Sequence, residues 1–130
     1  MNKNRSSQDK LERIDRITTA IAALEKQKET IKATGQVAPN GCVVSRYQVR
    51  QQQKIYWYYK LQAQKPTFPK AQNESALSRY KHLGKAGSEA HITAVMQVVR
   101  RAQLDEIQRN IDTLTQTLLN VSYDDEPEKK

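Results

Sequence analysis

The first third of the chain has the hydrophobic spacing of an amphipathic helix. From about Ser7 to Thr34, apolar residues recur every three or four positions, and Gly35 follows as a stop signal. Ser6, Ser7 and Asp9 are candidate N-caps. Six of these positions fit a heptad repeat and form a short seam, with Ile14, Ile21 and Lys28 at a and Ile17, Leu24 and Ile31 at d. Residues 1–34 are therefore predicted to form one helix with a short coiled-coil seam.

The middle of the chain changes to a period of two, which is typical of β-strands. Residues 42–49 and 54–61 are rich in β-branched and aromatic side chains and predict a hairpin. Its connection, Gln51-Gln52-Gln53, holds neither Gly nor Asn, so the turn type stays open. The prolines of residues 65–69 predict a loop, and 76–83 is expected to be a third strand or a short irregular segment.

Alternation along the predicted hairpin assigns its side chains to two faces. On the second strand, Trp57 and Tyr59 share a face with apolar neighbours and are expected in the core. On the first strand, Val43 and Val49 are expected to oppose the polar side chains. The other face is predicted to combine cations with exposed rings: Arg46, Gln48, Arg50, Tyr56, Tyr58 and Lys60.

The last third returns to helical spacing. A turn at 84–87 precedes Ser88, a good N-cap with Glu89 in the first turn, and a helix is expected over 88–120. Its apolar stripe is Ile92, Val95, Met96, Val99, Ala102, Ile107, Ile111, Leu114 and Leu118. The second half of this helix resembles the N-terminal helix in length and character, which favours antiparallel pairing within one chain or across a dimer. Residues 121–130 are expected to be a disordered acidic tail.

These elements predict an α+β fold: an N-terminal helix, a three-stranded antiparallel β-sheet, and a long C-terminal helix that pairs with the first. The domain boundaries follow at 1–34, 35–87, 88–120 and 121–130. The sheet segment has a charge that the rest of the chain lacks. The formal net charge is +8 over 130 residues, and residues 35–87 alone hold nine cations against Glu74. Seven of the eight aromatic residues also lie there, and cations interleaved with rings are typical of nucleic-acid surfaces.

No catalytic constellation is visible in the sequence, so we expect a protein that is not an enzyme. Motifs for phosphate loops, hydrolase nucleophiles and zinc proteases are absent. One cysteine and two histidines give too few ligands for a structural zinc site, and no cofactor, metal or small-molecule substrate is implied. No signal peptide is expected, because the first ten residues lack an apolar h-region, and the sequence has no apolar run of membrane-spanning length. A cytoplasmic location without membrane contact is expected, at the nucleoid if the protein binds DNA.

Two resemblances rest on the run from Tyr56-Trp-Tyr-Tyr-Lys-Leu61 to Arg79-Tyr-Lys-His-Leu-Gly-Lys85. The pattern resembles small uncharacterised bacterial proteins that have a "YYY-K" hairpin, an "RYxxLGK" strand and trailing helices. Some of these carry a cysteine pair in the hairpin that this chain lacks. The strands also look like the three-stranded DNA-binding modules of tyrosine recombinases, and that resemblance implies DNA contact by the sheet.

The sequence thus favours a non-enzymatic DNA-binding protein, either a regulator or an accessory factor of a mobile element. Duplex DNA is the expected partner, with Arg46 and Gln48 suited to base edges and the tyrosines to sugars or unstacked bases. The candidate nucleic-acid-binding residues are Arg46, Gln48, Arg50, Lys54, Tyr56, Tyr58, Lys60, Arg79 and Lys81. Alternatives are an RNA or single-strand binder, a helical protein–protein interaction module, and a basic sheet that binds an acidic protein or an anionic membrane surface. A homodimer through the helical seams is also expected. The target and the biological process stay open.

Overall fold

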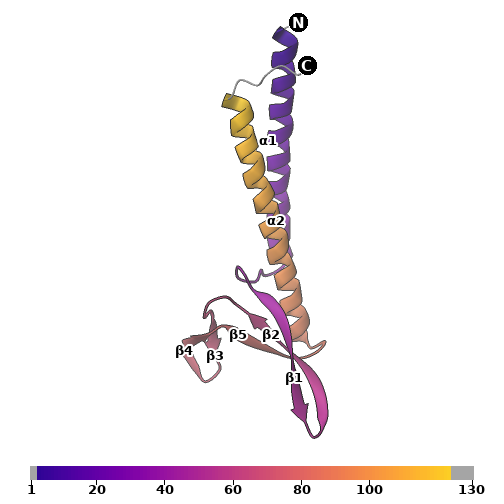
Figure 1. Cartoon of the computed structure of the whole chain (residues 1–130), viewed down its shortest axis with the longest axis vertical. Helices are drawn as coiled ribbons and strands as arrows, with labels where there is room; N and C mark the ends of the chain where they lie inside the picture. The colour runs from indigo at the N-terminus through magenta and orange to yellow at the C-terminus, as the bar shows by residue number, and fades with distance from the viewer. Residues whose placement is uncertain (1–2, 124–130) are drawn as a thin grey trace. The chain divides into compact units, whose positions relative to one another are not determined.

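The computed structural model describes residues 3–123 and confirms the α+β fold (Figure 1). The elements are α1 (Lys3–Thr34), β1 (Val43–Gln51), β2 (Lys54–Gln62), β3 (Phe68–Lys70), β4 (Asn73–Ser78), β5 (Tyr80–Lys85) and α2 (Glu89–Tyr123). Two compact units divide them. A helical unit holds α1 and the part of α2 from Gln103 onward, and a sheet unit holds residues 35–102.

In the helical unit, α1 lies antiparallel to the second part of α2 (Figure 1). The predicted heptad seam faces this partner, because all six of its side chains are half-buried. On α2 the buried residues are Leu104, Ile111 and Val121. One seam position is polar: Lys28 Nζ donates a hydrogen bond to Gln108 Oε1 of the opposite helix. The predicted pairing of the two long helices is therefore confirmed.

The ends of both helices differ from the prediction. The first helix begins at Lys3, so Ser6, Ser7 and Asp9 lie inside it and are not N-caps. Asp9 instead accepts a hydrogen bond from Arg13 Nε one turn later, at 3.0 Å. The second helix continues to Tyr123. Val121 was expected to open the acidic tail but is a buried helical residue; the tail beyond residue 123 lies outside the described residues.

The sheet unit is built on an antiparallel sheet with strand order β1-β2-β5. The predicted hairpin is confirmed, and its register runs from Val43 opposite Gln62 to Gln51 opposite Lys54. Only Gln52 and Gln53 connect the strands, with φ angles of 49° and 65°. Two central residues with positive φ in a two-residue hairpin loop define a type I′ turn. Because Asn and Gly usually occupy such turns, the sequence did not reveal it.

The third strand lies later than expected. Tyr80–Lys85 pairs with β2 as β5, whereas residues 76–78 belong to β4 in a separate two-stranded sheet with β3. The expected loop at 65–69 is also partly wrong, because Pro69 lies in β3 opposite Leu77. A proline is tolerated there because β3 has a neighbour on one side only, and the register shifts directly after Pro69.

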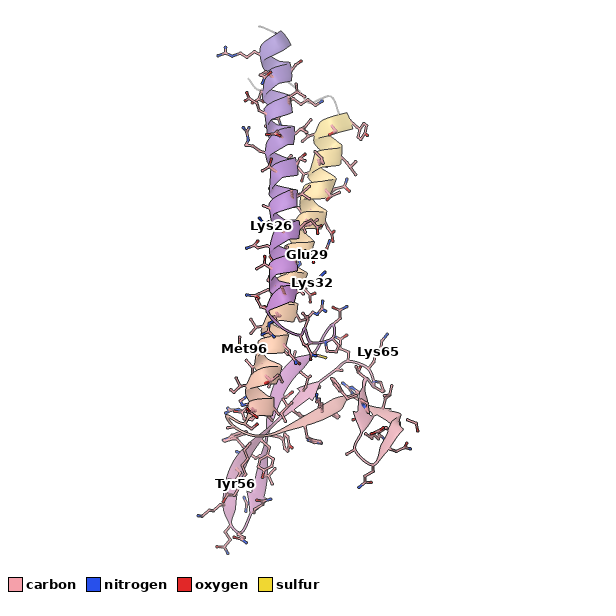
Figure 2. All side chains as sticks on the ribbon, turned by 180° about the vertical axis from the view of Figure 1, so that it is seen from behind. Lys26, Glu29, Lys32, Tyr56, Lys65 and Met96 are labelled. Atoms are coloured by element: carbon pink, nitrogen blue, oxygen red, sulfur yellow. The ribbon has the colours of Figure 1, made fainter. Side chains whose placement is uncertain are left out.

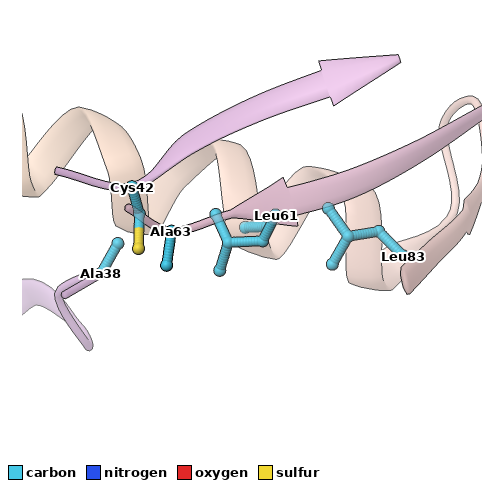
Figure 3. Packing of buried hydrophobic residues seen from close by; sticks show 6 residues of the cluster. Ala38, Cys42, Leu61, Ala63 and Leu83 are labelled. Carbon is cyan, nitrogen blue, oxygen red and sulfur yellow. The ribbon is translucent and has the colours of Figure 1, made fainter. Parts of the chain in front are cut away.

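A small hydrophobic cluster holds the sheet unit together (Figure 3). Its members are Ala38, Cys42, Leu61, Ala63, Leu83 and Ala94. Four of the six are Ala or Cys, so the first part of α2 packs close to the sheet. The connection after α1 is tied to the same helix: Ala38 N donates to Gln97 O at 3.1 Å, and Arg101 Nε donates to Ala38 O at 2.8 Å.

The start of α2 has the predicted cap but a different buried face. Ser88 Oγ accepts from His91 N at 3.2 Å and donates to Leu83 O at 2.8 Å, so Ser88 is the N-cap and ties the helix to β5. Ala94 and Val98 face the cluster, whereas Ile92, Met96 and Val99 of the predicted stripe are exposed (Met96 is labelled in Figure 2). The space between this helix and the sheet is narrow, so the small side chain of Ala94 fits there and the larger side chains of the predicted stripe do not. The prediction of the apolar stripe is therefore wrong for this half of the helix.

Candidate nucleic-acid interface

The β1–β2 hairpin extends beyond the third strand. β5 pairs with β2 only over Tyr58–Gln62, so residues 48–57 form a two-stranded extension, here called the hairpin arm (Figure 1). Gly84 lies where the register shifts between Tyr59 and Lys60, with a φ of 88° that favours glycine. Of the residues predicted to bind nucleic acid, Gln48, Arg50, Lys54 and Tyr56 therefore lie on the two-stranded arm, and the others lie on the three-stranded part of the sheet or directly before β5.

The cross-strand register places Arg46, Gln48 and Arg50 differently from the prediction. They lie opposite Tyr59, Trp57 and Ile55, respectively. Directly opposed residues share a face, so this polar row lies on the face that β2 shares with the core, not beside Tyr56 and Tyr58. The expectation that Arg46 and the exposed tyrosines form one surface is wrong. We call the side with Arg46 the core-side face and the side with Tyr58 the tyrosine face.

The core-side face changes from covered to open along the strands. Tyr59 packs against the cluster, and its ring stacks on the His91 ring of α2 with a centroid separation of 3.7 Å. One step further along β2, Trp57 is 39% exposed, and Ile55 is 52% exposed. The expectation of a core position is therefore confirmed for Tyr59 and wrong for Trp57, because the helix begins too late to cover the arm.

Arg46 lies on the exposed indole. Its guanidinium carbon is 4.1 Å from the centre of the Trp57 ring. Stacking of this kind uses the flat side of the guanidinium and leaves the N–H donors at its edge available. Within residues 3–123, the side chains of Arg46, Gln48 and Arg50 form no hydrogen bond or ion pair with the chain, and all three residues are exposed.

The tyrosine face is an interlocked set of rings and cations. The Tyr47 and Tyr58 rings are 6.1 Å apart, and the Tyr47 hydroxyl is 3.1 Å from His82 Nδ1. Lys60 Nζ lies 4.3 Å from the centre of the Tyr80 ring and 5.4 Å from that of Tyr47. Lys85 Nζ lies 5.7 Å from the centre of the ring of Tyr56, which is labelled in Figure 2. These rings are half-buried against one another, so they are less available than the core-side row.

Sequence reasoning missed five residues at these two faces: Tyr47, Trp57, Tyr80, His82 and Lys85. Trp57 was assigned to the core, and Lys85 to the turn before α2. Strand alternation could have identified Tyr47, because Tyr47 lies two residues from both Ser45 and Val49 and therefore shares a face of β1 with them. The positions on β5 depend on a register shift that composition does not reveal.

The remaining candidates are dispersed. Arg79 Nε donates to Ala63 O at 3.2 Å, which gives Arg79 a role in joining the chain segments before β3 and β5. Lys81 lies opposite Leu61 and borders a groove of about 390 Å³ that Glu89 of α2 also lines. Lys54 lies beside the turn at the tip of the arm. None of the three extends the core-side row: Lys54 alternates with Tyr56 and so lies on the tyrosine face, and Lys81 lies on the core-side face in the three-stranded part of the sheet.

The three strands carry cations without matching carboxylates. β1, β2 and β5 hold six basic residues and no Asp or Glu: Arg46, Arg50, Lys54, Lys60, Lys81 and Lys85. Among the described residues, the salt bridges lie within the helices, at positions such as Arg13–Asp9 and Arg109–Glu106, and none involves these six. The positive charge of the sheet is therefore not neutralised internally.

Cys42 is the single thiol of the chain and lies in the core. Burial raises the pKa of the Cys42 thiol, and the positive charge of Arg101 offsets part of that shift. A neutral, buried thiol is a poor nucleophile, so the hydrophobic cluster accounts for this residue. Elsewhere in the described part of the chain, no group of three or more His, Cys, Asp and Glu side chains is placed to hold a metal ion.

Comparison of the chain with protein-family models, with curated proteins and with solved structures finds no match in any of the three. The resemblances to bacterial hairpin proteins and to recombinase modules thus stay predictions. Between residues 3 and 123, neither helix combines the length and the apolar character that crossing a membrane requires. Assignment of a function therefore depends on the hairpin arm and its charge.

Proposed function

We propose that the protein is a non-enzymatic DNA-binding protein that places its hairpin arm in the major groove of duplex DNA. The observation that carries this proposal is the core-side row of Arg46, Gln48 and Arg50. The row is exposed, forms no hydrogen bond or ion pair with the described chain, and runs from the end of the three-stranded sheet at Arg46 along the hairpin arm. The major groove of B-DNA admits a two-stranded β-ribbon, and Arg and Gln are the side chains that bind base edges in pairs of hydrogen bonds.

Charge supports the same partner. Lys54 at the tip of the arm, together with Lys60 and Lys85 behind it, adds cations that reach phosphates on either side of a groove. With no carboxylate on the three strands, a polyanion approaches without repulsion from the sheet. An acidic protein surface is less well matched, because it offers no regular array of acceptors to a row of Arg, Gln and Arg.

A single-stranded nucleic acid is the second candidate, and the tyrosine face favours it. Stacking on exposed rings is the main source of affinity in single-strand binders. Tyr47 and Tyr58 already pack against each other, and Tyr47 is bonded to His82. Bases would have to replace these contacts, which is why we rank duplex DNA first.

The proposal is tested by fluorescence anisotropy with a labelled duplex of mixed sequence over a range of salt concentrations. Phosphate contacts by Lys54, Lys60 and Lys85 give a slope of log affinity against log salt of about −3, at about 0.9 per contact. A single strand of the same sequence is measured in parallel. Preference for the single strand would support the tyrosine face instead, and affinity that is weak and independent of salt would contradict both candidates and favour a protein-interaction role.

A matched pair of variants locates the interface. Arg50→Ala combined with Lys54→Ala removes two cations from the arm, while Lys26→Ala combined with Lys65→Ala removes two exposed cations elsewhere (Figure 2). The arm variant is expected to lose at least tenfold in affinity and, because only Lys54 of the two is assigned to a phosphate, about one unit of salt slope; the control is expected to retain most of both. Equal losses in the two variants would show that binding depends on net charge and not on the arm.

A further inference from the structure

The core-side row has a spacing that matches DNA. Arg46, Gln48 and Arg50 alternate along β1, and side chains on one face of a strand repeat every ~6.6–6.8 Å. Successive bases on one strand of B-DNA are ~3.4 Å apart, so neighbouring side chains of the row are about two base pairs apart. A strand that follows the groove can therefore place each member of the row at every second base pair.

The residue types in the row define what each would bind. Arg donates a pair of hydrogen bonds to O6 and N7 of guanine, and Gln bonds N6 and N7 of adenine. We infer that the core-side row recognises a five-base-pair element with G·C at its two ends, opposite Arg46 and Arg50, and A·T at its centre, opposite Gln48. This inference rests on the proposed function and adds sequence specificity to it.

Trp57 is a positioning residue in this arrangement. The centre of its ring lies 4.1 Å from the Arg46 guanidinium carbon, so it supports the Arg46 end of the row, and it lies opposite Gln48 in the strand register. A guanidinium that already rests on a ring loses less conformational freedom when it binds a base. Arg50 lies opposite Ile55 and has no ring beneath it, which makes it the internal comparison.

The experiment is selection of duplexes with a randomised nine-base-pair core, followed by affinity measurements on the selected sequence and on each single base-pair change. For the natural protein, replacing any of the three specified base pairs is expected to weaken binding about 5- to 100-fold. The two intervening base pairs are expected to matter less than threefold.

Variants then assign each position. Gln48→Ala is expected to abolish the preference at the central base pair alone. Arg46→Ala and Arg50→Ala are each expected to abolish the preference at the end of the element that the replaced arginine contacts. Lys54→Ala is the control, with an even loss of affinity over all sequences. Trp57→Leu is expected to weaken discrimination at the Arg46 end more than at the Arg50 end, with an unchanged salt slope. Circular dichroism melting confirms that each variant is folded.

The outcomes separate this inference from the proposed function. Salt-dependent duplex binding without sequence preference, or a preference that survives all three row variants, would overturn the inference and leave the proposed function standing. Absence of duplex binding over the whole salt range would overturn both. Equal loss of discrimination at the two ends in Trp57→Leu would remove the positioning role of the tryptophan alone.

Discussion

Individual side chains in the sheet unit have two separate tasks, and burial divides them. Cys42, Leu61 and Leu83 are buried and hold the fold. Arg46 and Gln48 are exposed on the same side of the sheet, further along the strands. Substitutions of the buried residues should change stability, and substitutions of the exposed residues should change binding. The two effects should be separable because the structure describes no contact between the two groups of side chains.

Cys42 gives a prediction about pH. Its folded-state pKa is raised by burial, so the stability that the neutral thiol contributes is complete below the pKa of an unfolded thiol, about 8.5, and is lost as the pH rises toward the folded-state value. Urea unfolding of the natural protein and of Cys42→Ala at pH 7 and pH 10 checks this. The advantage of the natural protein should shrink at high pH, by at most about 1.4 kcal/mol per pH unit.

Chemical labelling provides the control for that prediction. At pH 7 the native thiol should react with iodoacetamide at least tenfold more slowly than in urea, because it is both buried and neutral. A difference between the natural protein and Cys42→Ala that does not change between pH 7 and pH 10 would contradict the assignment of the shift to this thiol.

At the scale of elements, the sequence predicted each long helix and both hairpin strands, because their periodicity is a local property. The face shared by Arg46 and Trp57 was not predictable in this way. Alternation shows which side chains of one strand share a face. Matching the faces of β1 to those of β2 also requires the length of the loop between them, and no Gly or Asn marks Gln52 and Gln53 as the turn. The position of β5 was missed for a related reason, since a bulge shifts its register.

The turn is also where the arm can be stabilised. Gln52 and Gln53 both have positive φ, which costs a residue with a Cβ about 1–2 kcal/mol compared with the usual right-handed conformation. Gln52→Asn combined with Gln53→Gly should therefore raise the free energy of unfolding by about 1 kcal/mol, as measured in urea. Gln72→Asn combined with Gln64→Gly makes the same two chemical changes at exposed positions outside this turn. A stabilisation of equal size in that control would contradict the explanation.

For the whole molecule, the helical unit raises the question of assembly. The six seam residues of α1, from Ile14 to Ile31, are half-buried, and none of them is buried completely. A pair of helices leaves one side of such a seam in water, and a second pair would cover it in a four-helix arrangement. A second copy of the chain supplies a pair with a matching seam, which agrees with the homodimer expected from the sequence.

Sedimentation velocity tests this expectation across protein concentrations from micromolar upward. We predict a species of about twice the 14.9 kDa chain mass at the higher concentrations. Met96→Glu combined with Val99→Glu is the control, because these exposed residues lie on the part of α2 in the sheet unit. A dimer lost in this variant would assign the interface to that apolar stripe, and a monomer at every concentration would contradict dimerisation.

The position of β1 in the sheet has a consequence of another kind. β1 is an edge strand for all nine of its residues, and its outer N–H and C=O groups form no ladder with another strand of the described chain. Open edges of this length recruit strands from other molecules unless charge keeps them apart. Arg46 and Arg50 supply that charge, so the same two side chains protect the protein from aggregation. Variants that lack both must be checked for fibrous or amorphous association before a loss of DNA binding is attributed to the interface.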